Sequence, residues 1–379
     1  MLTLNKYHSY NSNDLSKGCE MCVRGEKLVL FVTGVCPRKC YFCPLSDAKY
    51  GKDVSFANER SLKSAQDLVK EAELMDAKGA GITGGDPLIK IDRTLDYIKN
   101  LKERFGVQFH IHLYTSFNLV SEKVMQMLYQ AGLDEIRFHP DLESKNFWKN
   151  VIIARKFPWL IGIEVPIIPT KKQELCEMID FFCDKVDFMN LNELERADNE
   201  LSKTDEMGFK SKGQFSYAIQ GSVELGLELI EYAHTKKATL PIHLCTAKLK
   251  DATQLTKRLE RESHGMKRDF DRVEDDGLLV RGALYLPELV PGFGYRVKLA
   301  EVEKEPFVEQ LRDLMKKIQD RVSLKENEYF LDMEKPRILL GVKNLRVHKV
   351  FFHSLGLLTA IVKELPTADQ LEIEVEFLA

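Results

Sequence analysis

The stretch LVLFVTGVCPRKCYFCP, residues 28–44, decides the fold and the chemistry that the rest of the chain serves. Residues 28–32 form an apolar run typical of a buried strand, and three cysteines follow, Cys36, Cys40 and Cys43. This C-x3-C-x2-C spacing gathers three thiolates around one point. A four-iron cluster needs four outer ligands, normally cysteines. Three ligands leave one iron open, which indicates chemistry at the cluster. A zinc site with a fourth ligand elsewhere is the alternative.

Working outward, strand-like and helix-like segments alternate from residue 27 to about residue 268. Such alternation predicts a parallel sheet with right-handed crossovers, and six or seven units predict a partial or near-complete (β/α) barrel. The predicted strands cover residues 27–33, 79–84, 107–115, 135–139, 160–168, 187–191 and 239–245.

The segments around this barrel are of three kinds. Residues 1–26 form an extension that carries a C-x2-C pair, and residues 197–214 form a charged surface loop or lid. Residues 275–379 form a smaller α+β domain of unknown role, with helices predicted at 305–322 and 349–365.

Several predicted strands carry polar side chains at every second position. His110, His112 and Tyr114 share one face, and Arg137 and His139 do the same on the next strand. Because apolar faces pack under the helices, we expect the polar faces to line a substrate cavity in the barrel lumen. A solvated edge strand is the alternative for any one of them.

Composition narrows the class of protein. The chain has 379 residues, a formal net charge of -3 and 44% hydrophobic residues, so a packed core is expected and charge does not indicate nucleic acid. Eight cysteines in this length are not a disulfide scaffold. No apolar run reaches about 18 residues, so we expect no membrane span and a reducing cytoplasmic location.

A family resemblance rests on two motifs. Cys36, Cys40, Phe42 and Cys43 match the C-x3-C-x-aromatic-C motif of the radical S-adenosylmethionine (SAM) superfamily. The usual Gly-Gly-Glu-Pro turn after the second strand is represented by Gly84-Gly85-Asp86-Pro87, with Asp86 for glutamate. Within the superfamily the chain resembles the group related to pyruvate formate-lyase activating enzymes, which includes uncharacterised archaeal proteins.

The resemblance implies a specific chemistry. A [4Fe–4S] cluster on Cys36, Cys40 and Cys43 would chelate SAM at its open iron. Reductive cleavage of SAM would give a 5′-deoxyadenosyl radical that abstracts hydrogen from a substrate, and the cofactors supply this chemistry. An oxygen-sensitive, anaerobic enzyme with an electron donor such as ferredoxin or flavodoxin is expected.

The resemblance also implies residue roles around SAM. Phe42 would lie near adenine, and Gly84, Gly85 and Asp86 would hold the methionine amino group. Thr115 and Ser116 are placed to hydrogen-bond ribose or carboxylate. Arg137 suits the SAM carboxylate, with His139 nearby, unless Arg137 pairs internally with Asp141 or Glu164.

Cys19 and Cys22 form a second group. With His243 and Cys245 they could hold a structural zinc ion or an auxiliary iron–sulfur cluster. Cys245, with His243 beside it, could instead be a catalytic thiol that donates hydrogen to a substrate radical. Two reduced surface cysteines are the simplest alternative.

Two function classes remain open at this stage. The leading prediction is a radical SAM enzyme acting on an unidentified peptide, protein, small molecule or RNA. The competitor is a non-catalytic iron–sulfur or zinc protein for electron transfer or assembly.

Overall fold

The structure, a computed structural model, describes residues 2–379. The chain divides into two compact units, the first ending at Arg258 and the second running from Leu259 to Ala379. Within residues 2–379, every helix falls short of the length and apolar character needed to cross a bilayer.

The first unit is built on a ten-stranded sheet whose central strands are parallel, in the order β10-β9-β8-β7-β6-β5-β2. Short antiparallel strands flank the two ends, so the sheet is a partial barrel, which confirms the predicted fold class. In chain order the strands are β1 (Tyr10–Asn11), β2 (Lys27–Phe31), β3 (Phe56–Ala57), β4 (Arg60–Ser61), β5 (Gly79–Thr83), β6 (His110–Ser116), β7 (Glu135–His139), β8 (Leu160–Ile167), β9 (Phe188–Glu193) and β10 (Ile242–Cys245).

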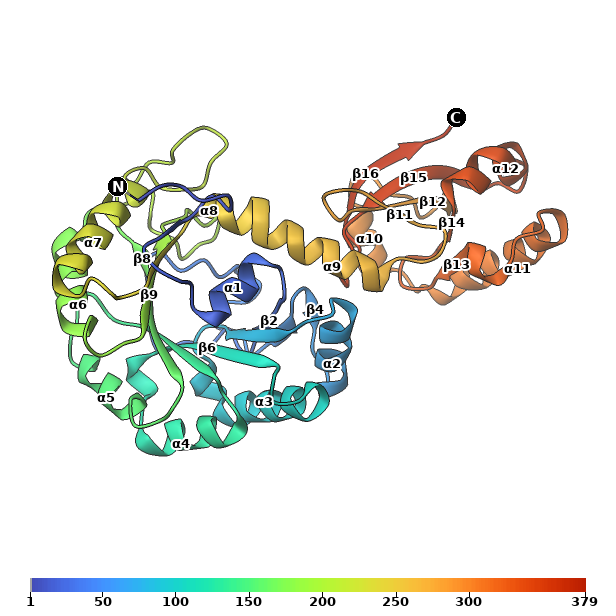
Figure 1. Cartoon of the computed structure of the whole chain (residues 1–379). Coiled ribbons are helices and arrows are strands. Elements are labelled where there is room, and N and C mark those ends of the chain that lie inside the picture. Colours follow the sequence, from blue (N-terminus) through green and yellow to red (C-terminus); the bar gives the residue numbers. More distant parts are fainter. Residues whose placement is uncertain (1) are drawn as a thin grey trace. The chain divides into compact units, whose positions relative to one another are not determined.

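Helices cover the outside of this sheet (Figure 1). They are α2 (Ala65–Leu74), α3 (Ile91–Phe105), α4 (Glu122–Ala131), α5 (Val151–Ala154), α6 (Lys172–Phe182) and α7 (Ser222–Lys236), with 3₁₀ turns η1 (Pro87–Lys90), η2 (Phe117–Leu119) and η3 (Trp148–Asn150). Local sequence sets their ends. Ser64 and Asp67 form a capping box at α2, and Gly132 ends α4 in the left-handed conformation.

Helix α1 (Lys17–Val23) lies inside the curve of the sheet, unlike the helices that cover its outer face (Figure 1). The Gly18 N–H donates to Glu135 Oε2 at 3.2 Å. A Cβ on Gly18 would come within 2.5 Å of Arg137 Nη2, so glycine lets the helix approach the strands. The amino-terminal segment therefore fills the lumen near the amino-terminal ends of the strands.

Three helical segments follow β10: α8 (Ala247–Leu249), the π-helical η4 (Lys250–Leu255) and α9 (Thr256–Met266), which carries the chain into the second unit. The second unit is an antiparallel sheet, ordered β13-β14-β12-β15-β16 with β11 paired to β12. Its elements are β11 (Arg272–Val273), β12 (Leu279–Tyr285), α10 (Tyr295–Glu301), α11 (Glu305–Arg321), η5 (Glu326–Glu328), β13 (Tyr329–Asp332), β14 (Arg337–Leu340), α12 (Val342–Ser354), β15 (Leu358–Glu364) and β16 (Glu372–Phe377).

The helix predicted at residues 349–365 is wrong in its second half. Helix α12 ends at Ser354, Gly356 follows with φ +80°, and residues 358–364 form strand β15 between β12 and β16. Glycine accepts this left-handed backbone at little cost, so the chain can reverse there.

Candidate functional site

The loop after β2 carries the three motif cysteines at the carboxyl ends of the strands. Cys36, Cys40 and Cys43 line one cavity of about 220 Å³, here called the cluster cavity, together with Gly84, Gly85, Asp86, Thr115, Ser116 and others. The structure therefore brings together residues that the sequence places up to 103 positions apart, from Cys36 to His139.

The cysteine arrangement discriminates between kinds of metal site. Across residues 2–379 no three His, Cys, Asp or Glu side chains are grouped tightly enough for one metal ion. A zinc ion with sulfur ligands at about 2.3 Å requires those sulfurs roughly 4 Å apart. A cubane places each cysteine on a different iron, so a wider set of three thiols around a cavity fits it.

The glycine turn packs directly against the cysteine loop. A Cβ on Gly85 would lie 2.3 Å from the Val35 carbonyl oxygen, and one on Gly84, whose φ is +153°, 2.5 Å from that of Thr33. The Gly85 and Asp86 N–H groups donate to Thr33 and Val35 at 2.7 and 3.0 Å. With these donors used, the turn has carbonyl oxygens left to offer, which suit an amino group.

Asp86 joins this turn to the end of β6. Its carboxylate accepts hydrogen bonds from the Leu88 N–H, the Thr115 hydroxyl and both the N–H and hydroxyl of Ser116, at 2.8 to 3.1 Å. Burial raises the pKa of this carboxyl group, and the accepted hydrogen bonds oppose the rise. The hydroxyl groups of Thr115 and Ser116 thus donate to Asp86. Toward a bound ligand, these two hydroxyl oxygens can therefore act as hydrogen-bond acceptors.

Phe42 and His139 stand where three cavities meet. Both line the cluster cavity, an outer cavity of about 380 Å³ and an inner cavity of about 330 Å³. Their ring centroids are 5.8 Å apart. The His139 Nδ1 lies 3.1 Å from the Glu164 carbonyl oxygen, and burial lowers the pKa of His139 to about 4. The neutral ring therefore donates from Nδ1 and keeps Nε2 as an acceptor.

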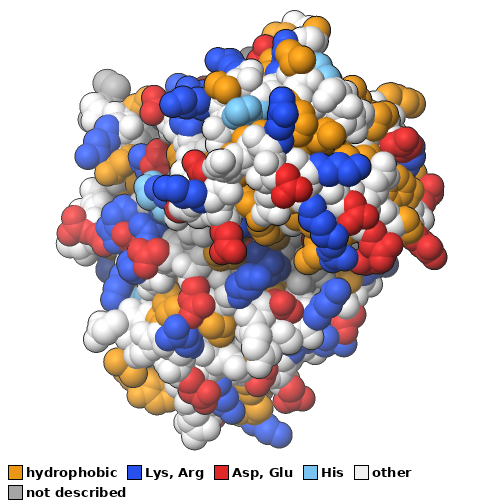
Figure 2. All heavy atoms as spheres, turned by 90° about the vertical axis from the view of Figure 1, so that its right-hand side faces the viewer, with side chains coloured by type: hydrophobic (Ala, Val, Ile, Leu, Met, Phe, Trp, Pro, Cys, Tyr) orange, Lys and Arg blue, Asp and Glu red, His pale blue; other side chains and the backbone are white. Residues whose placement is uncertain are grey.

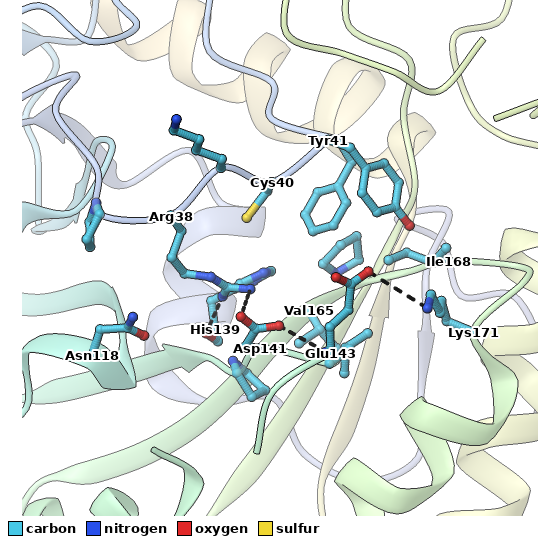
Figure 3. Close-up of a pocket in the computed structure, with 16 residues that line it drawn as sticks. Arg38, Cys40, Tyr41, Asn118, His139, Asp141, Glu143, Val165, Ile168 and Lys171 are labelled. Carbon is cyan, nitrogen blue, oxygen red and sulfur yellow. Dashed lines mark hydrogen bonds and ion pairs between the residues drawn. The ribbon is translucent and has the colours of Figure 1, made fainter. Parts of the chain in front are cut away.

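The outer cavity is rimmed by ion pairs (Figure 3). Arg38 donates from Nη1 to the His139 carbonyl at 2.9 Å, and its Nη2 lies 3.6 Å from Asp141 Oδ2. Lys171 and Glu143 form a looser pair at 3.9 Å. The sequence reasoning missed Arg38, although its position between two motif cysteines was the available signal.

A family model described as the radical SAM superfamily matches residues 30–151. A Methanocaldococcus jannaschii protein, named provisionally as a glycyl-radical enzyme activating enzyme, is 39% identical over 290 residues, covering 74% of this chain and 76% of the relative. The chain belongs to the radical SAM superfamily. It is a radical SAM enzyme, and a [4Fe–4S] cluster and SAM are its cofactors.

Solved radical SAM structures are more distant. Methylornithine synthase is 13% identical with a TM-score of 0.36, over 59% of this chain and 71% of that one. The methyltransferase TsrM of Kitasatospora setae, with cobalamin and a [4Fe–4S] cluster bound, is 12% identical with a TM-score of 0.34, over 48% and 38%. At this similarity neither structure adds to the argument.

In this radical SAM barrel, Arg137 is held by internal partners. Its Nε donates to Glu135 at 2.6 Å, its Nη1 to Tyr114 and Glu164 at 3.0 and 2.9 Å, and its Nη2 to Ser16 and Cys19. All five N–H groups of a guanidinium have acceptors, so a SAM carboxylate would have to displace one. The expectation of Arg137 as a carboxylate ligand is therefore corrected in favour of the internal salt bridge with Glu164.

Side chains of the strands themselves fill the part of the lumen around Arg137. Below the inner cavity, Lys27 contacts the His110 Nδ1 at 2.6 Å, and His112 and Arg137 bond the Tyr114 hydroxyl. The polar faces do point inward, and the inner cavity lies toward the carboxyl ends of the strands, with Arg137, Glu164, Asn192 and Lys250 among its walls. The prediction of a lumen that is open along its length is therefore corrected to a cavity toward the carboxyl ends of the strands.

The second cysteine group lies in that filled part. Cys19 Sγ accepts from Asn190 Nδ2 at 3.2 Å and from Arg137 Nη2 at 3.4 Å. Cys245 packs with Val23 and Leu249 in a small apolar cluster. Among residues 2–379 no three metal-ligating side chains are grouped for one ion, so the arrangement of Cys19, Cys22, His243 and Cys245 does not support the zinc hypothesis, and the auxiliary iron–sulfur cluster stays a prediction.

The predicted catalytic pair lies on β10, next to β9 in the sheet. Neither Cys245 nor His243 lines the cluster, outer or inner cavity. Burial lowers the pKa of His243 to about 4, and both its ring nitrogens lack a hydrogen-bond partner among the described residues. Cys245 pairs in register with Asn192, which does line the inner cavity, so a role for Cys245 as a hydrogen donor stays a prediction.

Proposed function

We propose that the chain holds its cluster through Cys36, Cys40 and Cys43 and binds SAM with the methionine end in the cluster cavity. One observation carries this proposal: the three cysteines and the Gly84-Gly85-Asp86 turn line the same cavity. The fourth iron would face the amino and carboxylate groups of SAM. When bound, cluster and SAM supply a 5′-deoxyadenosyl radical that abstracts hydrogen from a substrate.

The chain's own residues bind and orient in this scheme. The Asp86 carboxylate fixes the glycine turn against β6. Phe42 and His139 would hold adenine and ribose at the junction of the cavities, through ring contacts and the His139 Nε2 acceptor. The radical carbon of the 5′-deoxyadenosyl group would then face the inner cavity.

For the substrate, we propose a protein, the hydrogen being taken from its backbone. The support is the 39% identity to a protein named as a glycyl-radical enzyme activating enzyme. A short backbone segment would enter the inner cavity, whose walls carry both Glu195 and Lys250, already paired at 2.5 Å. We propose ferredoxin or flavodoxin as the electron donor.

The test is anaerobic reconstitution with iron and sulfide, reduction by dithionite and addition of SAM. Intact protein should form 5′-deoxyadenosine, and Cys40→Ala should form none. Cys183→Ala, a change at the end of α6, is the matched control and should keep full activity. Absence of product from the reconstituted intact protein would contradict the proposal.

The alternatives make different predictions. A non-catalytic cluster protein would show no change in its electron paramagnetic resonance (EPR) spectrum when SAM is added. For RNA as substrate, the face shown in Figure 2 offers no support, since basic and acidic side chains are interspersed over it.

A further inference from the structure

The connection between β9 and α7, residues 194–221, folds back onto the cysteine loop. It contains residues 197–214, the charged segment for which the sequence predicts a surface loop or lid. Residues 32–55, which include the cysteine loop, contain no helix or strand. Turn hydrogen bonds within the segment hold some of its carbonyl groups, such as that from the Cys43 N–H to the Cys40 carbonyl at 3.1 Å, and donors from the connection hold others.

Asn199 supplies two of these donors from a single side chain. Its Nδ2 donates to the Cys43 carbonyl and to the Leu45 carbonyl, both at 2.9 Å. Its Oδ1 accepts from the Leu201 and Ser202 N–H groups at 3.0 and 2.7 Å. The amide oxygen of Asn199 thus fixes the turn at residues 199–202, and its nitrogen fixes residues 43–45, here called the arm.

Neighbouring contacts act in the same direction. The Lys203 N–H donates to the Tyr41 carbonyl at 2.7 Å, so carbonyls 41, 43 and 45 are all bound by this connection. Phe209 joins Tyr41 and Phe42 around a small apolar cluster. The connection therefore meets the loop at alternate residues on both sides of Phe42.

We propose that Asn199 is a positioning residue for the iron–sulfur cluster: by binding the carbonyls of Cys43 and Leu45 it holds the third thiolate ready for its iron. The inference rests on the proposed ligation by Cys36, Cys40 and Cys43. Without these two hydrogen bonds the arm gains conformations that must be lost again on ligation, so iron is released more easily. A tenfold faster release, which corresponds to about 1.4 kcal/mol, is within what two such hydrogen bonds contribute.

Asn199→Asp separates the two ends of the side chain. Aspartate keeps acceptors for the Leu201 and Ser202 N–H groups but has no N–H for the two carbonyls. Asn199→Ala removes both functions without adding charge. Asn100→Ala is matched by residue type, since Asn100 also donates to a backbone carbonyl, on α3. Ser202→Ala is matched by segment, since it removes a hydroxyl contact with Thr204 inside the connection.

The experiment measures iron release to a chelator from reconstituted protein without SAM, together with the EPR spectrum of the reduced cluster and the melting temperature of each apo-protein. We expect Asn199→Asp and Asn199→Ala to release iron about tenfold faster with altered EPR spectra, while both controls match the parent.

Parental release and spectra from Asn199→Asp would overturn the inference, even if Asn199→Ala were fast, because the turn alone would then matter. Faster release accompanied by an equal effect in Ser202→Ala, or by a lower apo-protein melting temperature, would also overturn it. A parent protein that takes up no cluster would instead refute the proposed function.

Discussion

Two groups of cysteines in one barrel behave differently although both look like metal motifs in sequence. Burial raises the pKa of Cys36 to about 11 and that of Cys22 to about 12, so thiol acidity does not separate them. Their surroundings do. Cys36, Cys40 and Cys43 line a cavity, whereas Cys19 already has polar partners in a packed interior and Cys245 sits among apolar side chains. A metal site needs unoccupied space as well as ligand spacing.

The largest effect should come from replacing cysteines by alanine in each group and comparing the two results. Cys40→Ala should abolish 5′-deoxyadenosine formation and the cluster's EPR signal, because the cubane loses one of three protein ligands. Cys19→Ala/Cys22→Ala should keep the iron, sulfide and zinc content of the parent. Loss of iron from the double variant would show that Cys19 and Cys22 also bind metal, which contradicts the difference proposed between the two groups.

Arg137→Met should destabilise the fold by roughly 3–5 kcal/mol, since it leaves the buried carboxylates of Glu135 and Glu164 without their cation. Urea unfolding of the apo-protein measures this. Arg155→Met, which removes a more exposed pair with Asp187, should cost less than about 1 kcal/mol. Equal losses of unfolding free energy in the two variants would show that the Arg137 ion pairs are no better shielded from water than the Arg155 pair.

Gly85→Ala should weaken SAM binding by roughly five- to a hundredfold. The added methyl group meets the Val35 carbonyl oxygen, and overpacking of this kind costs about 1–3 kcal/mol. The measurement is SAM titration of the cluster's EPR signal. Gly213→Ala, with no atom within 4 Å of its added Cβ, is the control and should bind as the parent does.

The smallest effect concerns pH. Burial lowers the pKa of Lys27 to about 7, whereas the unfolded chain holds this proton to about pH 10.5. Between these values the unfolded state binds more protons, so stability should rise with pH, by about 1 kcal/mol from pH 7 to 8. Lys27→Met should flatten that slope in denaturant titrations, and an unchanged slope would contradict a buried, largely neutral amine.

Sequence predicted the parallel strands because short strand-like segments, some apolar throughout and some apolar on one face, alternate with helical patterns. It missed α1, whose seven residues are too few for a clear helical period, although Ser16 is a usable cap. It missed β15 because the apolar run after Gly356 fits either element.

The functional site likewise contains features that the sequence predicts and features that it does not. The cysteine and glycine motifs are local and could be predicted. Among the partners of Arg137, Glu135 lies two residues earlier on the same strand, and Glu164 is one of the two internal partners predicted from sequence. Ser16 and Tyr114 lie on other segments, and no spacing along the chain reveals them. Polar residues on one face of a strand predicted the lumen, but not how much of it the chain itself fills.

Helix α1 has a consequence for the order of events during turnover. Because this helix fills the lumen near the amino-terminal ends of the strands, cofactor, substrate and products bound as proposed would share passage at the carboxyl ends. A macromolecule seated across that passage would hold SAM inside and keep methionine from leaving. Turnover on such a substrate would then be sequential: SAM first, the large partner second, and release in the reverse order.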